Sequence, residues 1–349
     1  MFYIHQTACI SPQQTFIDIN LDVLRVSEDN KLYALEPLYQ GIPPGLLRRM
    51  GKAVKVAVGT ALPLLKQSGT ADGIIIGTAN GGMEESVKFL KQIIEYDEDA
   101  LTPGNFVQST SNAVASQISM LTRNKGYNIT HVHRGLAFET AVIDAAMMVK
   151  ENTGSTYLLG GVDEISSYNH NLDNLKGWNK KEQVSNTDLY SSTTPGSIAG
   201  EGAAMFMVNG EKANSTAQLK AIATLHTTDV AEVRNELQRF LDTHLLPDEK
   251  IDLLLSGENG DSSLLQFYTG CESVLGDINS VARFKHLCGE YPTASAFALW
   301  LACHIIQTQQ LPPHTIKSKA STNTGFKTIL IYNNHKKEQH SFMLLCKPG

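Results

Sequence analysis

The sequence predicts a layered α/β fold built from two similar halves, and two observations carry this prediction. Short runs of aliphatic residues alternate along all 349 residues with longer segments whose apolar residues recur every three or four positions. The order of these segments, strand–helix three times and then a pair of strands, occurs twice. Buried strands that alternate with helices are typical of layered folds with mostly parallel sheets. We expect one half over 1–210 and another over 217–349.

In the first half, apolar runs bounded by turn residues predict strands, and amphipathic spacing predicts helices. The expected strands are 2–10, 72–79, 127–132, 156–164 and 202–209. The expected helices are 46–67, 83–94, 112–123 and 137–150, so this half has one helix more than the repeated order requires. The stretch 166–195 is polar and poor in aliphatic residues, and we expect it to be a long surface excursion.

The second half repeats this order after a polar linker. The expected strands are 219–227, 251–257, 281–287, 327–334 and 340–347, and the expected helices are 230–246, 262–275 and 293–309. In the first of these helices Val233, Leu237, Leu241 and Leu245 share one face, which is typical of an amphipathic helix on a sheet. The halves share no residue pattern, so the repeat is one of architecture.

The composition excludes several classes of function. Apolar residues make up 42% and charged residues 18% of the chain, and Lys and Arg are scattered within a net charge of −6, which argues against a nucleic-acid surface. No apolar run approaches the roughly 18 residues of a membrane span, and the first residues do not resemble a secretory signal. Five cysteines without C-x-x-C spacing predict reduced, buried thiols. They are Cys9, Cys271, Cys288, Cys303 and Cys346. We expect a cytoplasmic protein with no metal and no other cofactor.

Residues 126–137, GYNITHVHRGLA, predict a strand that turns sharply into a helix. We call this turn, at residues 133–135, the elbow. Many α/β enzymes mount a nucleophile at such a turn, because the turn exposes the side chain and the helix N-terminus stabilises negative charge. Here the residue at that point is Gly135. We expect a glycine to be accepted there because it tolerates a positive φ.

Segments along essentially the whole chain resemble, in order, the motifs of the β-ketoacyl-acyl carrier protein synthases, which have the thiolase fold. These segments are NFVQSTSNAVASQIS (105–119), the elbow and its helix (126–146), LLGGVDEIS (158–166), GSIAGEGAAMFMV (196–208), DLLLSGENGDSS (252–263) and KHLCGEYPTASAF (285–297). The resemblance implies a thiolase-like α/β fold of two βαβαβαββ halves in a layered αβαβα arrangement.

The resemblance also implies that the catalytic residues of the family are replaced. Its nucleophilic cysteine corresponds to Gly135, and its two histidines correspond to Gly257 and Glu290. Without the thiol no acyl-enzyme can form, and an ionised carboxylate would repel the enolate that the histidines stabilise. Lys285 is retained, but NNHKKEQH, residues 333–340, stands where the family has a G-F-G-G loop. We therefore expect no ketosynthase activity.

A thiolase-fold chain without these residues resembles the chain-length factors of type II polyketide systems. That likeness implies a heterodimer with an active ketosynthase, whose acyl tunnel this chain shapes and through which it meets an acyl carrier protein. Glycine rather than glutamine at the cysteine position implies a divergent branch, such as companion subunits of aryl-polyene-type pathways. A homodimer that only binds acyl carriers is an alternative.

The resemblance implies that the strand before the elbow pairs antiparallel with its counterpart across the dimer axis, where its edge would otherwise be left unpaired. Phe106 matches an aromatic residue that reaches into the partner's acyl pocket in ketosynthases, so it is the candidate length-setting side chain; ordinary interface packing is the plainer role. The residues expected at the interface are Phe106, Gln108, Asn112, Tyr127 and Ile129.

A second reading keeps the chain an enzyme that reuses the cleft for other acyl-thioester chemistry. The candidate acids, bases and nucleophiles are Glu258, Glu290, His133 and Cys288. For Cys288 we favour a small residue packed near a helix start over a relocated nucleophile.

Two further groups of polar residues have plainer explanations than catalysis. For His131 and His133 we favour a hydrogen-bonded structural pair over a metal site. A carboxylate pair is conceivable among Glu258, Asp261 and Glu290, but we favour ion pairing with Lys285 or Arg134.

Overall fold

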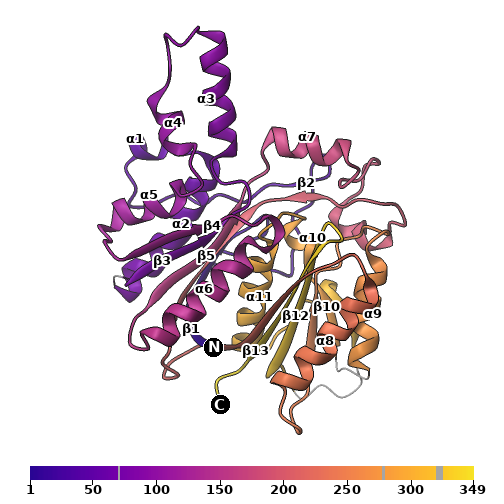
Figure 1. Ribbon diagram of the computed structural model, residues 1–349. Coiled ribbons are helices and arrows are strands. Elements are labelled where there is room, and N and C mark those ends of the chain that lie inside the picture. The colour runs from indigo at the N-terminus through magenta and orange to yellow at the C-terminus, as the bar shows by residue number, and fades with distance from the viewer. Residues whose placement is uncertain (70, 277–279, 320–324) are drawn as a thin grey trace.

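The computed structural model describes residues 1–69, 71–276, 280–319 and 325–349 (Figure 1). In the first half, the main strands lie where the apolar runs predict them. They are β1 (Phe2–Ile10), β3 (Gly73–Gly77), β4 (Tyr127–His131), β5 (Tyr157–Asp163) and β7 (Gly202–Asn209), and the short β2 (Lys31–Leu32) and β6 (Ala199–Gly200) pair separately. The helices are α1 (Pro44–Leu47), α2 (Lys52–Ser68), α3 (Met83–Glu95), α4 (Pro103–Gln108), α5 (Ala113–Thr122), α6 (Ala137–Glu151) and α7 (Ser167–Leu175).

The second half begins at β8, and seven residues separate it from β7. Its strands are β8 (Ala217–His226), β9 (Leu253–Ser256), β10 (Ser280–Arg283), β11 (Ile316–Lys319), β12 (Thr328–His335) and β13 (Gln339–Cys346). Its helices are α8 (Val230–His244), α9 (Leu265–Leu275), α10 (Lys285–Cys288) and α11 (Ala294–Thr308). Three 3-10 turns complete the described elements: η1 (Arg134–Leu136), η2 (Asn186–Ser191) and η3 (Pro313–Thr315).

The strand order confirms the duplication of architecture. The main sheet runs β11-β10-β9-β12-β13-β8-β1-β7-β5-β3-β4. From its outer edge inward the first half reads β4-β3-β5-β7-β1, and the second half reads β10-β9-β12-β13-β8 with β11 added outside it. When the five main strands of each half are numbered along the chain, both halves have the order third, second, fourth, fifth, first. The halves meet where Phe2 of β1 pairs with Leu219 of β8. The expectation of mostly parallel strands is wrong. In each half the fifth strand, β7 or β13, runs antiparallel to both neighbours, and β11 and the β1–β8 pair add further antiparallel contacts.

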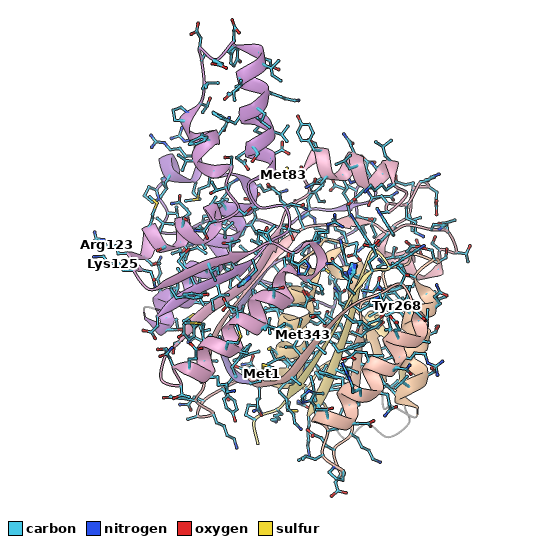
Figure 2. All side chains as sticks on the ribbon, in the orientation of Figure 1. Met1, Met83, Arg123, Lys125, Tyr268 and Met343 are labelled. Carbon is cyan, nitrogen blue, oxygen red and sulfur yellow. The ribbon has the colours of Figure 1, made fainter. Side chains whose placement is uncertain are left out.

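The two halves of the main sheet form two of five layers, αβαβα, because alternating side chains of each half face a shared central core and a separate outer core. In β3, Ile74 and Ile76 pack with α2 and α5 in one outer core, whereas Ile75 joins α6 and α11 in the central core. In β9, Leu254 faces α8 and α9 in the other outer core. The central position of α11 follows from its sequence, because a helix that is apolar on nearly all sides must be buried. Figure 2 shows Met343 of β13 at this central core.

Three local expectations differ from the structure. The helix expected over 46–67 is interrupted, because Gly51 has an extended backbone (ψ 163°) and α2 starts after it. The strand expected over 281–287 ends at Arg283, and α10 follows. The excursion over 166–195 contains α7 and η2 and is held by buried polar groups: the Asn186 side chain donates to the carbonyl oxygens of Arg25 and His286.

The helices α3 and α4 form an arm that projects from the body, and Met83 marks its base (Figures 1 and 2). Among the described residues, no helix combines the length and the apolar character that crossing a membrane requires. All five cysteines are buried and free of disulfides, as the spacing predicts.

Candidate functional site

The elbow after β4 has the sharp turn that its sequence predicts, but for a different reason. Arg134 carries the positive φ, 48°, and Gly135 is not among the residues with positive φ. The expectation that Gly135 serves as a backbone device is therefore wrong. A Cβ atom at Gly135 would lie 2.2 Å from Cβ and 2.3 Å from Cγ of His335, far inside any real contact. A glycine stands at the elbow because the His335 side chain occupies the space of a side chain there.

His335 reaches the elbow because β12 and β13 extend into a long hairpin. Residues 333–340 form its tip, and the turn has positive φ at Lys336 (52°) and Lys337 (68°). The N–H of Gly135 donates to Oε1 of Gln339 on the same tip (2.9 Å). The hairpin tip is thus fixed against the elbow by packing and by a hydrogen bond.

The same hairpin covers the second glycine of the site, Gly257 at the end of β9. A Cβ atom there would lie 2.7 Å from Oδ1 of Asn333 and 3.0 Å from the carbonyl oxygen of Tyr332. The N–H of Gly257 donates to that carbonyl oxygen (2.7 Å). One hairpin therefore leaves no room for a side chain at either glycine.

Glu290 is held as a carboxylate by the groups around it. Its Oε2 lies 3.0 Å from Nζ of the fully buried Lys285 and accepts a hydrogen bond from the Asn259 amide (2.9 Å). Its Oε1 lies 3.7 Å from Nδ1 of His335. Burial alone would raise the pKa of Glu290, but Lys285, His335 and Asn259 outweigh it and lower the pKa to about 2. The expected pairing of Glu290 with Lys285 is confirmed.

The cavity beside Glu290 is small, about 50 Å³, and it shares lining residues with a cleft of about 410 Å³ at His335 and Arg134. Pockets that bury drug-sized ligands measure roughly 300–1,000 Å³, and about 10–15 Å³ of such volume holds one water. The small cavity therefore has room for a few waters and none for an acyl chain, and the larger space lies in the cleft on the other side of His335 and Lys336. Polar side chains line much of the small cavity, including Asn80, Glu164 and Asn259.

The other proposed acids, bases and nucleophiles do not meet at this cavity. Cys288 is fully buried, burial raises the pKa of its thiol, and it does not line the cavity. Glu258 pairs with Arg283 (3.0 Å) and Lys317 (2.7 Å), not with Lys285 or Arg134. His133 is exposed on the surface.

The remaining polar candidates also have local partners. Asp261 lines the cavity, but its Oδ1 accepts hydrogen bonds from the N–H and hydroxyl of Ser263. His131 lies 2.9 Å from Asp144, not against His133, so the expected histidine pair does not form. Within the described ranges, no group of three or more His, Cys, Asp or Glu residues is placed to hold a metal ion.

The expected interface residues lie along one side of the first half. β4 is the last strand of the main sheet, and among the described strands it pairs with β3 alone. Phe106 is 61% exposed on the arm and packs its ring 5.3 Å from Phe89. Gln108 and Asn112 are already bonded within the chain, Gln108 to residues before α2 and Asn112 to Thr130 of β4.

Sequence reasoning missed His335 and Asn259 as parts of the site. NNHKKEQH was recognised only as a replaced loop, although two histidines in a polar hairpin between apolar strands were a visible signal. Asn259 lies two residues from Gly257, so the motif alignment already brought it to the same place.

The comparisons with known proteins concern the family and the fold. Residues 27–174, which include the elbow, match the family model for the N-terminal domain of β-ketoacyl synthases. Over these residues, less than half of the chain, it is similar to that family. No curated protein sequence matches it.

Solved structures share the fold of this chain over its full length. A ketosynthase in complex with its chain length factor from Xenorhabdus doucetiae has a TM-score of 0.79 at 11% identity, covering 99% of this chain and 98% of that one. The ishigamide ketosynthase/chain length factor has a TM-score of 0.77 at 14% identity, covering 100% and 99%. A type II polyketide acyl carrier protein in complex with its ketosynthase has a TM-score of 0.78 at 13% identity, covering 99% of both chains.

Proposed function

We propose that this chain is a non-catalytic, chain-length-factor-like subunit that pairs with an active β-ketoacyl synthase in fatty-acid, polyketide or aryl-polyene-type biosynthesis in the cytoplasm. One observation carries the proposal: the hairpin tip fills the positions that match the nucleophile and the first histidine, Gly135 and Gly257. At the third position, Glu290 is a carboxylate with a pKa of about 2. A thioester cannot form without a nucleophile, and a fixed negative charge opposes an enolate.

The pairing is supported by surfaces that the chain leaves uncovered. The free edge of β4 offers backbone N–H and C=O groups to another strand. The arm beside it carries exposed apolar side chains, among them Ile94 at 82% and Val107 at 67% exposure. Contiguous exposed apolar groups on a soluble fold are typical of protein interfaces. An acyl carrier protein would act on the partner's active site through this complex.

The competing enzyme is less well supported. Of its four candidate residues, Glu290 alone lines the small cavity. That cavity has no room for an acyl thioester, none of the four residues lines the larger cleft beside it, and Glu290 is paired with Lys285.

The purified chain is expected to form no acyl-enzyme and no condensation product with malonyl-carrier and an acyl primer. Gly135→Cys is expected to change neither result, because a thiol has no space beside His335 and neither Gly257 nor Glu290 can donate to the enolate. Intact-protein mass spectrometry after incubation checks both. An acyl adduct on any residue of the cleft would show that the chain is an enzyme.

Replacing Phe106 by alanine is expected to lengthen the partner's products. The change removes a ring from the arm and leaves space for several methylene groups if the ring lines the partner's tunnel. The measurement is the product-length distribution of the co-expressed pair, with malonyl decarboxylation by the partner unchanged.

Leu90→Ala is the matched control, because it removes another exposed apolar side chain of the arm. It is expected to leave product length unchanged. An intact Phe106→Ala heterodimer with products of unchanged length would exclude Phe106 as the length-setting residue.

A further inference from the structure

A larger cavity lies apart from the site around Gly135, Gly257 and Glu290, which we call the vacated site. Its volume is about 460 Å³, and it opens beside the C-terminal part of α11, where Trp300, His304 and Gln307 line it. Glu290 and Pro292 of the vacated site precede the N-terminus of that helix. Trp300 and Gln307 lie six and thirteen residues after the start of α11 at Ala294, or about 9 and 20 Å along its axis. None of the residues that line one cavity lines the other.

One wall of the cavity is an irregular segment and another is a helix. Residues 11–43, which contain almost no regular secondary structure, form one wall, and α2 forms another. Long irregular segments in a compact domain are usually functional. Trp300 lies buried at the cavity, whereas Ile17 (56% exposed) and Leu38 (88% exposed) stand at the rim. The volume falls in the range of small-molecule sites.

The charge at this cavity is single and positive. Lys66 carries the one charge among the described lining residues, and no carboxylate lines the cavity. His304 stacks on Trp300 (5.6 Å between ring centroids), and burial lowers its pKa, which keeps it neutral. Lys66 has no carboxylate within salt-bridge distance in the described part of the chain. Gly41 makes room for it, since a Cβ there would lie 2.7 Å from Nζ.

We propose that this cavity binds a small apolar molecule with one negative charge, of the aliphatic carboxylate class. The apolar tail packs along Leu62, Leu64 and Trp300, and the carboxylate pairs with Lys66 at the rim. The site shares no lining residue with the cavity beside Glu290, so its test is separate from that of the non-catalytic role.

Isothermal titration calorimetry with decanoate measures binding at this site. We expect one saturable site per chain, and decyltrimethylammonium, with the same tail and a cationic head, is expected not to saturate it. Lys66→Gln is expected to lower the affinity for decanoate about five- to tenfold, because one charge-assisted contact is lost. Leu38→Asp, which adds a carboxylate at an exposed rim position, is expected to weaken it as well. Lys88→Gln, an exposed lysine on the arm, is the control and is expected to bind decanoate like the wild type.

A second measurement locates the ligand through the two tryptophans of the chain, Trp178 and Trp300. 11-Bromoundecanoate is expected to quench the fluorescence of Trp178→Phe, which retains Trp300, and to leave that of Trp300→Phe unchanged. Several results would overturn the proposal: no saturable decanoate binding up to about 1 mM, equal affinity in Lys66→Gln and wild type, or quenching of Trp178 alone.

Discussion

Gly135→Ala is expected to destabilise the protein by about 3 kcal/mol, the upper end of the usual cost of overpacking. The added methyl group would lie 2.2 Å from Cβ of His335, whose backbone is held by pairing with Gln339 of β13. Because the clashing atom is Cβ itself, a change of side-chain rotamer at His335 cannot relieve it. Urea unfolding monitored by circular dichroism gives the change in unfolding free energy.

The clash with His335 can be isolated by a double-mutant cycle. In a His335→Gly background the clashing atoms are gone, so Gly135→Ala is expected to cost less than about 1 kcal/mol there. Gly154→Ala is the matched control, because no atom lies within 4 Å of the position its Cβ would take. Equal costs of Gly135→Ala in both backgrounds would show that His335 is not what excludes a side chain from the elbow.

Glu139→Gln is expected to stabilise the protein increasingly as pH rises. Glu139 is fully buried on α6 and accepts one hydrogen bond, from the hydroxyl of Ser341 (2.8 Å). Burial raises its pKa to about 7, above the ordinary glutamate value. An acid whose pKa is higher in the folded than in the unfolded state stabilises the folded state at low pH. For Glu139 this contribution is complete below the unfolded pKa, near 4.5, and is lost as pH rises through about 7.

Glutamine has no ionisation to lose, so the stability difference between Glu139→Gln and the wild type should grow between pH 5 and pH 8.5. The growth is expected to be on the order of 3 kcal/mol. Thermal or urea unfolding at several pH values measures it, with Glu211→Gln at an exposed turn as the control. A constant difference across this range would show that Glu139 remains ionised in the folded protein.

The layers of the fold could be predicted because apolar periodicity is a local property of the chain. The apolar run of β3 and the all-apolar α11 each indicate burial without knowledge of their neighbours. The direction of β7 and β13 could not be predicted, because a buried strand has the same pattern whether its neighbours are parallel or antiparallel. The break before α2 depends on the extended backbone of Gly51.

The site divides in the same way. The order of motifs brings Gly135, Gly257 and Glu290 together in one predicted site, and it also predicts the Lys285–Glu290 pair. The position of His335 could not, because it depends on how a hairpin tip docks on an elbow 200 residues earlier in the chain. The role of Gly135 was therefore assigned to backbone conformation, when packing decides it.

The central claim, a non-catalytic subunit that pairs with an active ketosynthase, is tested most directly by native mass spectrometry of the chain co-expressed with β-ketoacyl synthases from its own organism. We predict a one-to-one heterodimer with one of them, formed along the free edge of β4 and the arm. We also predict that omitting this chain abolishes the synthase's activity or changes its product length. A homodimer in every co-expression, together with a synthase whose activity and products are the same without this chain, would contradict the claim.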